Sequence, residues 1–419
     1  MRQPPVVFVP GITATTLEDY YPLDPEKVWT AVLRKDYERI SLHPDDLRYE
    51  GREPARVQSG AVFTLPYQDF VEALRHELRP SNAAPTPVFA FSYDWRQDCR
   101  QSAEQLASFV DEVMARTKLL PHYKRDVPNI DLVGHSMGGL IVADYLSRFG
   151  STGKVRRVVT IGTPFQGAVD AVSKLVTGMG RLADHVPRDR EREAARTFPA
   201  IYQLLPTFDG AAVTENGTPV KLLKPSAWQP SVVKSLGRYI RLQKALVDPD
   251  KLFASYLAMA RGLRDRIRSL NVNDVLGRGA DDWLPIAGVG SKTLVRVELR
   301  RVGRRQRSIR FHFPQPRNEW PRTDNTGDGT VPLKGACPPF LGIERVVCIS
   351  PRDFSRWEFQ DRSLARLAGF HAALPTVNLV QRITLRFLRN NYGGQVWAHR
   401  PPGVDRSEWR KPSWLREPN

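Results

Sequence analysis

The sequence predicts an α/β protein with a mainly parallel sheet. Short apolar runs typical of buried strands recur along the chain, and amphipathic, helix-like segments separate most of them. Strands joined by crossover helices pair in parallel and are covered on both faces. The length of 419 residues exceeds the usual size of one hydrophobic core, so we expect a core domain with a large insertion, or two domains.

The first 165 residues are expected to form the first part of the core. PVVFVPG is an apolar run that ends at Pro10–Gly11, as a buried strand does where it breaks into a loop. A polar and aromatic segment at about 18–60 is lid-like. The next segments read in turn as helix, strand, helix, strand–turn–helix and strand: YQDFVEALRHEL, VFAFSYDW, SAEQLASFVDEVMART, NIDLVGHSMGGLIVADYLSRFG and KVRRVVTIGTP.

Residues 166–275 are expected to form an inserted helical cap, because strand-like patterns become rare there. GAVDAVSKLVTGM and KLFASYLAMARGLRDRIRSL both have helical periodicity. The second carries one apolar stripe, for which packing on the core is favoured over membrane contact: Phe253, Tyr256, Leu257, Ala260, Leu263, Ile267 and Leu270.

The core is expected to resume over residues 276–392. WLPIAGVG and VVCIS are strand-like, and LVQRITLRFL is a closing helix. Residues 293–313 alternate apolar and charged side chains on both sides of an Arg-rich turn, which indicates a basic hairpin. The Pro-, Trp- and Arg-rich residues 393–419 are expected to be an extended tail.

The chain is strongly basic: 62 Lys and Arg against 45 Asp and Glu give a net charge of +17. Such a surface attracts polyanions, and it is compatible with peripheral contact with an anionic membrane. No nucleic-acid-binding module is recognisable, which argues against nucleic acid as the partner.

Three cysteines cannot all pair within one chain, so we expect free thiols. No apolar run reaches the ~18 residues that span a bilayer, and the N-terminal segment lacks a signal-peptide pattern. These features favour a cytoplasmic or peripheral membrane location. They leave the oligomeric state open.

The residues GHSMGG at 134–139 contain the G-x-S-x-G pattern between an apolar strand and an amphipathic helix. This is the setting of the nucleophile elbow of α/β-hydrolases, in which a sharp turn exposes a serine hydroxyl. Gly134 and Gly138 suit the turn because neighbouring backbone comes too close for a Cβ. The sequence therefore predicts Ser136 as a nucleophile and the α/β-hydrolase fold.

A serine hydroxyl needs a base and an acid, which follow it in the order Asp/Glu, then His, in this fold. Two histidines lie late enough in the chain, and His371 precedes the closing helix whereas His399 lies in the tail. The loop TDNTGDGTVP offers two acids, and we favour Asp328 over Asp324 because flanking glycines allow a sharp turn.

Acyl transfer also needs hydrogen-bond donors aimed at the developing oxyanion. The backbone N–H of Met137, directly after the nucleophile, is one candidate. The N–H of Ile12, in the loop VPGITATTLE after the first strand, is the other.

Together these motifs resemble the lecithin:cholesterol acyltransferase family, which includes lysosomal phospholipase A2. The resemblance runs through PVVFVPGITATTLED, KVWTAVL, YDWR, GHSMGG, IGTPFQGAV, IAGVGSKT and GDGTVP to His371, and covers most of residues 5–390. It implies cleavage of a glycerophospholipid ester and transfer of the acyl group from serine to water or a lipid alcohol. Residues 18–60 contain no cysteine, unlike the lid of animal members, and Ala14 replaces a glycine usual in the opening loop.

The leading functional hypothesis is a serine-dependent lipid ester hydrolase or acyltransferase that acts without a metal or organic cofactor. A soluble carboxylesterase or thioesterase for smaller acyl groups is the alternative within the same chemistry. A catalytically silent protein that binds lipids or polyanions is the alternative outside it.

Overall fold

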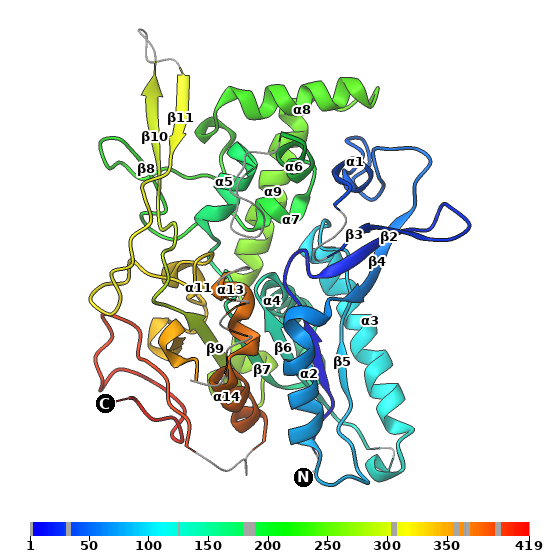
Figure 1. Cartoon of the computed structure of the whole chain (residues 1–419), viewed down its shortest axis with the longest axis vertical. Coiled ribbons are helices and arrows are strands. Elements are labelled where there is room, and N and C mark those ends of the chain that lie inside the picture. The colour runs from blue at the N-terminus through cyan, green and yellow to red at the C-terminus, as the bar shows by residue number, and fades with distance from the viewer. Residues whose placement is uncertain are drawn as a thin grey trace.

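A central sheet of six parallel strands runs through the computed structural model (Figure 1). Its spatial order is β12-β9-β7-β6-β1-β5, and its strands are β1 (Val6–Val9), β5 (Val88–Ala90), β6 (Ile130–His135), β7 (Val155–Ile161), β9 (Trp283–Gly288) and β12 (Val347–Ile349). The predicted mainly parallel sheet is confirmed. The structure describes residues 3–30, 35–124, 126–178, 189–302, 308–355, 358, 361, 363, 365, 369–389 and 395–418.

Helices cover both faces of the sheet because successive strand side chains point to opposite sides. Val7 and Val9 face a core formed with α3 (Cys99–Lys118), α4 (Met137–Phe149) and α9 (Pro249–Arg268). Val6 and Phe8 face a second core, formed with α2 (Thr64–Leu78) and α14 (Asn378–Leu388). The predicted apolar stripe of α9 is buried in the first core, so its packing on the core is confirmed.

The chain between β7 and β9 is mainly helical, and α9 runs from it onto α4. Its other elements are α5 (Val169–Thr177), α6 (Asp189–Ala195), α7 (Pro199–Gln203), β8 (Ala212–Thr214), α8 (Pro230–Leu242) and α10 (Val272–Val275). The predicted hairpin forms as β10 (Val297–Val302) and β11 (Ser308–His312), but it joins β8 rather than the central sheet. Phe311 packs there against Trp228, which precedes α8.

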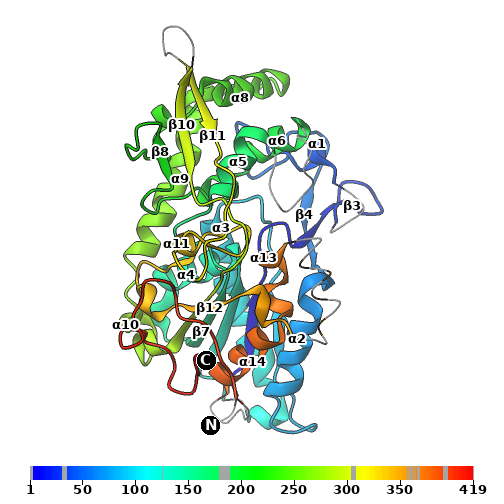
Figure 2. The same cartoon turned by 60° about the vertical axis from the view of Figure 1, so that its left-hand side comes forward.

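The N-terminal segment after β1 forms a small antiparallel sheet beside the central one. Its strands are β2 (Thr15–Asp19), β3 (Glu26–Trp29) and β4 (Val57–Val62), and the short helix α1 (Tyr37–Ile40) follows β3. Two further short helices, α11 (Leu333–Ala336) and α13 (Phe370–Ala373), lie near the carboxyl edge of the sheet (Figure 2). Among the described helices, none combines the length and the hydropathy that a bilayer-spanning segment requires.

The C-terminal residues 395–418 differ from the expected appendage. They form no regular helix or strand, yet Val396, Trp409 and Leu415 are buried in the second core. His399, which the sequence placed in the expected tail, exchanges two backbone hydrogen bonds with Cys348, and its side chain contacts Asp353. The apolar residues spaced along this segment hold it against the sheet.

Candidate active site

Ser136 stands at the sharp turn between β6 and α4, with φ of 53° and ψ of −129°. A non-glycine residue rarely adopts positive φ, so the surrounding packing must hold this conformation. A Cβ on Gly138 would lie 2.2 Å from the carbonyl oxygen of Val9, and one on Gly134 would lie 2.7 Å from Cα of Gly139. The predicted need for glycine on both sides of the turn is confirmed.

The structure brings Ser136, His371 and Asp328 together in one buried hydrogen-bonded chain. Nε2 of His371 lies 2.8 Å from Oγ of Ser136, and its Nδ1 lies 2.6 Å from Oδ2 of Asp328. The other carboxylate oxygen accepts the backbone N–H groups of Thr330 and Val331 at 2.9 and 2.7 Å. A carboxylate only accepts hydrogen bonds, so Nδ1 carries the imidazole proton and the lone pair of Nε2 faces the serine.

The two alternatives weighed from the sequence lie elsewhere. Asp324 forms an ion pair with Lys334 at 3.1 Å, and both side chains are partly exposed. His399 lies 3.0 Å from Asp353.

The loop after β1 lies against Ser136 because of strand register. Val9 pairs with Gly134, so the parallel strands β1 and β6 end side by side. A Cβ on Gly11 would lie 3.0 Å from Cβ of Ser136, and Ile12 lines the same cavity as Ser136. Met137 is the first residue of α4, and the first N–H groups of a helix have no partner within the helix. Both predicted oxyanion donors therefore belong to segments that adjoin Ser136.

A second buried network links this loop to His371 through Tyr67 and His135. The N–H of Gly11 donates to Oη of Tyr67 at 3.1 Å, and that oxygen lies 2.8 Å from Nδ1 of His135. Nε2 of His135 lies 3.1 Å from the carbonyl oxygen of His371, which can only accept. Neutral His135 therefore carries its proton on Nε2 and accepts the Tyr67 hydroxyl proton at Nδ1. Burial, reinforced by the nearby His371, lowers the pKa of His135 well below its usual 6.5.

The YDWR motif supports the same region. The hydroxyl of Tyr93 donates to the carbonyl of Pro10 at 2.9 Å, directly before Gly11. The indole of Trp95 donates to the carbonyl of Thr15 at 3.3 Å. Arg96 is fully buried, and its guanidinium contacts Glu50, Asp94 and the carbonyl of Ile40. The motif thus fixes the loop after β1 and the N-terminal segment that follows it.

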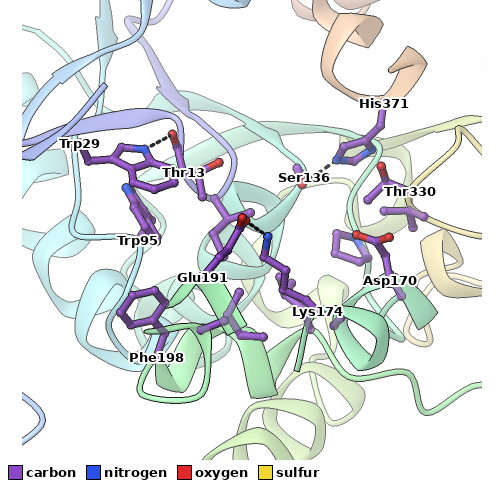
Figure 3. A pocket seen from close by; sticks show the side chains of 18 of the residues that line it. Thr13, Trp29, Trp95, Ser136, Asp170, Lys174, Glu191, Phe198, Thr330 and His371 are labelled. Atoms are coloured by element: carbon purple, nitrogen blue, oxygen red, sulfur yellow. Dashed lines mark hydrogen bonds and ion pairs between the residues drawn. The ribbon is translucent and has the colours of Figure 1, made fainter. Parts of the chain in front are cut away.

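Ser136 and His371 open into a cavity with a mainly apolar wall (Figure 3). The wall comes from the N-terminal segment, the YDWR motif, the inserted helices and the loop that carries Asp328. Its apolar members include Ile12, Trp29, Trp95, Phe198, Ile201, Leu204 and Val331. Trp29 donates to the carbonyl of Thr13 at 3.1 Å. Lys174 of α5 and Glu191 of α6 form an ion pair inside the cavity.

Part of this site could not be recognised from sequence patterns. The spacing of Tyr67 is that of an ordinary apolar position in an amphipathic helix. Lys174 and Glu191 are two of many charged residues in the chain, and no motif marks them. Tyr93, in contrast, belongs to YDWR, which we singled out only as part of the family resemblance.

Residues 80–235 match the family model described as Lecithin:cholesterol acyltransferase. The predicted resemblance to this family is confirmed. The chain is also similar to the solved structure of the Tle4-Tli4 complex, with a TM-score of 0.55 and 13% identity, covering 90% of this chain and 98% of that chain. The α/β-hydrolase fold is therefore confirmed.

Two other solved structures are less similar. One is the mature lipase BlEst2 of Bacillus licheniformis, with a TM-score of 0.39, 13% identity and coverage of 92% of both chains. The other is phospholipase PlaB from Legionella pneumophila, with a TM-score of 0.33, 12% identity and coverage of 94% of this chain and 61% of that chain. No curated protein matches the chain.

Proposed function

We propose that this protein is a serine-dependent hydrolase or acyltransferase of lipid esters, with Ser136, His371 and Asp328 as its catalytic triad. The observation that carries the proposal is the hydrogen-bonded chain from Oγ of Ser136 through His371 to Asp328. It ends in a cavity with a mainly apolar wall, which suits a substrate with an acyl chain.

In the first half of the reaction, Nε2 of His371 takes the proton of Ser136 while Oγ attacks the ester carbonyl carbon. Asp328 remains a carboxylate and stabilises the imidazolium through Nδ1. The tetrahedral intermediate collapses, the C–O bond to the alcohol breaks, and His371 returns the proton to that leaving oxygen. An acyl-serine and a free alcohol, such as a lysolipid, result.

The negative charge of the intermediate needs donors that are already in place. We assign this role to the backbone N–H groups of Ile12 and Met137. In measured cases such a donor contributes ~3 to 4 kcal/mol to transition-state stabilisation. The hydrogen bonds of Gly11 and of the Pro10 carbonyl, to Tyr67 and Tyr93, support the first donor by fixing its loop.

In the second half, water or the hydroxyl of a lipid alcohol gives its proton to His371 and attacks the acyl-serine. Ser136 regains its proton when the new acid or ester leaves. The family resemblance supports a glycerophospholipid as the acyl donor and both kinds of acceptor.

The test is turnover of a panel of phospholipids and neutral lipids by the wild type and Ser136→Ala, with products identified by mass spectrometry. Free fatty acid with lysolipid, absent in the variant, is expected for a phospholipase, and a new lipid ester is expected for an acyltransferase. If only short-chain esters or thioesters were cleaved, the lipid assignment would be wrong and the serine mechanism would stand. A wild type inactive on every substrate would favour the silent binding protein.

A further inference from the structure

Helix α8 exposes a basic stripe. Lys234, Arg238 and Arg241 are exposed, and at about 100° per residue they lie within about 60°, or about a sixth of the helix circumference. Leu242 lies at the edge of the same stripe. The sequence of α8 contains no Asp or Glu, so no acidic residue of the helix offsets these charges.

These cations are not used in ion pairs within the described part of the chain. Other exposed arginines do have such partners: Arg300 pairs with Glu298 at 2.8 Å, and Arg116 pairs with Glu112 at 2.7 Å. The α8 stripe therefore presents uncompensated positive charge to solvent.

Two large apolar side chains are exposed at and just beyond the C-terminal end of α8. Leu242 is 76% exposed and Leu246, in the following turn, is 93% exposed. The turn is held in place, because the carboxylate of Asp45 accepts the backbone N–H groups of Leu246 and Val247 at 2.9 and 2.8 Å. The backbone that carries these leucines is therefore held by hydrogen bonds, within α8 for Leu242 and to Asp45 for Leu246.

Helix α8 lies near the candidate active site. α8 packs on α6, which contributes Glu191 and Ala195 to the wall of the cavity that holds Ser136. In Figures 1 and 2, α8 lies at the end of the molecule opposite both chain termini, next to α6 and α1. A partner bound to α8 would therefore lie close to the cavity wall.

We propose that Lys234, Arg238, Arg241, Leu242 and Leu246, here called the α8 surface, dock on an anionic lipid bilayer. The cations meet the headgroup phosphates, and the leucines enter the boundary of the acyl chains. A nucleic acid would use the cations but leave both leucines in water, so the observations favour the bilayer. The proposal goes beyond the proposed function, because docking requires no catalysis.

The experiment measures co-sedimentation of the full chain with vesicles of phosphatidylcholine containing about one third phosphatidylglycerol, a composition that gives a negative surface. Ser136→Ala is the background, so the vesicles stay intact whatever the catalytic activity is. One variant replaces Lys234, Arg238 and Arg241 by Gln. Its matched control replaces Arg406, Arg410 and Arg416 by Gln. These are three exposed cations of the C-terminal segment, so the control changes the net charge equally. Thermal unfolding verifies that both variants fold.

The α8 variant is expected to lower the vesicle partition coefficient about 100-fold, and the control by less than about threefold. Replacing Leu242 and Leu246 by Ser is expected to lower it by at least about tenfold, at low and at high salt alike. Equal losses in the two charge variants would overturn the proposal, since they would reflect net charge alone. So would a Ser136→Ala parent protein that does not sediment with the vesicles, or one that binds duplex DNA more tightly than vesicles through the same residues.

Discussion

Replacing Gly138 by Ala tests the packing that places the loop after β1 beside Ser136. The new Cβ would lie 2.2 Å from the carbonyl oxygen of Val9 and 2.5 Å from that of Pro10, whereas real Cβ contacts stay beyond 3.0 Å. The obstructing atoms are backbone, so the loop must retreat by about 0.8 Å. Because this loop carries Ile12, the proposed oxyanion donor moves away from the reaction centre.

The expected result is a decrease in kcat of about 100-fold, the loss typical of a misplaced oxyanion donor. Overpacking should also cost about 1–3 kcal/mol in free energy of unfolding, although Ala is otherwise preferred to Gly within a helix. Ester hydrolysis and urea denaturation measure the two effects. Gly277→Ala is the matched control, since its nearest neighbouring atom lies 4.0 Å away, and it should keep wild-type kcat. A folded Gly138→Ala protein with wild-type kcat would refute the reasoning.

Three further predictions concern the buried groups around Ser136. Asp328→Asn should lower kcat about 10⁴-fold in steady-state assays, because the amide can donate to Nδ1 of His371 and so place the imidazole proton on Nε2. Tyr67→Phe should cost about 1–3 kcal/mol of stability in urea denaturation, because it leaves the Gly11 N–H and Nδ1 of His135 buried without a partner; unchanged stability would contradict that network. Burial keeps His135 neutral in the folded protein while the unfolded chain takes up a proton below about pH 6.5, so the free energy of unfolding should fall as pH drops, by up to about 1.4 kcal/mol per pH unit for this group. That contribution should be absent in His135→Asn, and denaturation curves at several pH values measure it.

Local sequence patterns were sufficient to predict the fold and the chain order of the candidate catalytic residues. GHSMGG indicated the turn at Ser136 because its glycines answer a steric need that is local to the turn. His371 and Asp328 could be chosen over His399 and Asp324 because the fold restricts where the base and the acid enter the site. Both alternatives have other partners in the structure.

Features that depend on tertiary contacts were not predictable from local patterns. Tyr67 joins Gly11 to His135 only because α2 packs on one face of the central sheet, and its spacing is that of any amphipathic helix. The strand β8 is three residues long, and its pairing with the basic hairpin depends on a partner more than eighty residues away. The C-terminal segment is held in place by single buried residues that are irregularly spaced in the sequence. It therefore shows neither helical nor strand periodicity.

The most direct test of the central claim is to trap the acyl-enzyme. Wild type is mixed with a phospholipid, quenched in acid within the first turnover, and digested for peptide mapping by mass spectrometry. The proposed function predicts an acyl group on Ser136, formed at the rate at which lysolipid is released, and no adduct on Ser136→Ala. Lipid turnover that persists in Ser136→Ala, or an acyl group found only on another residue, would contradict it.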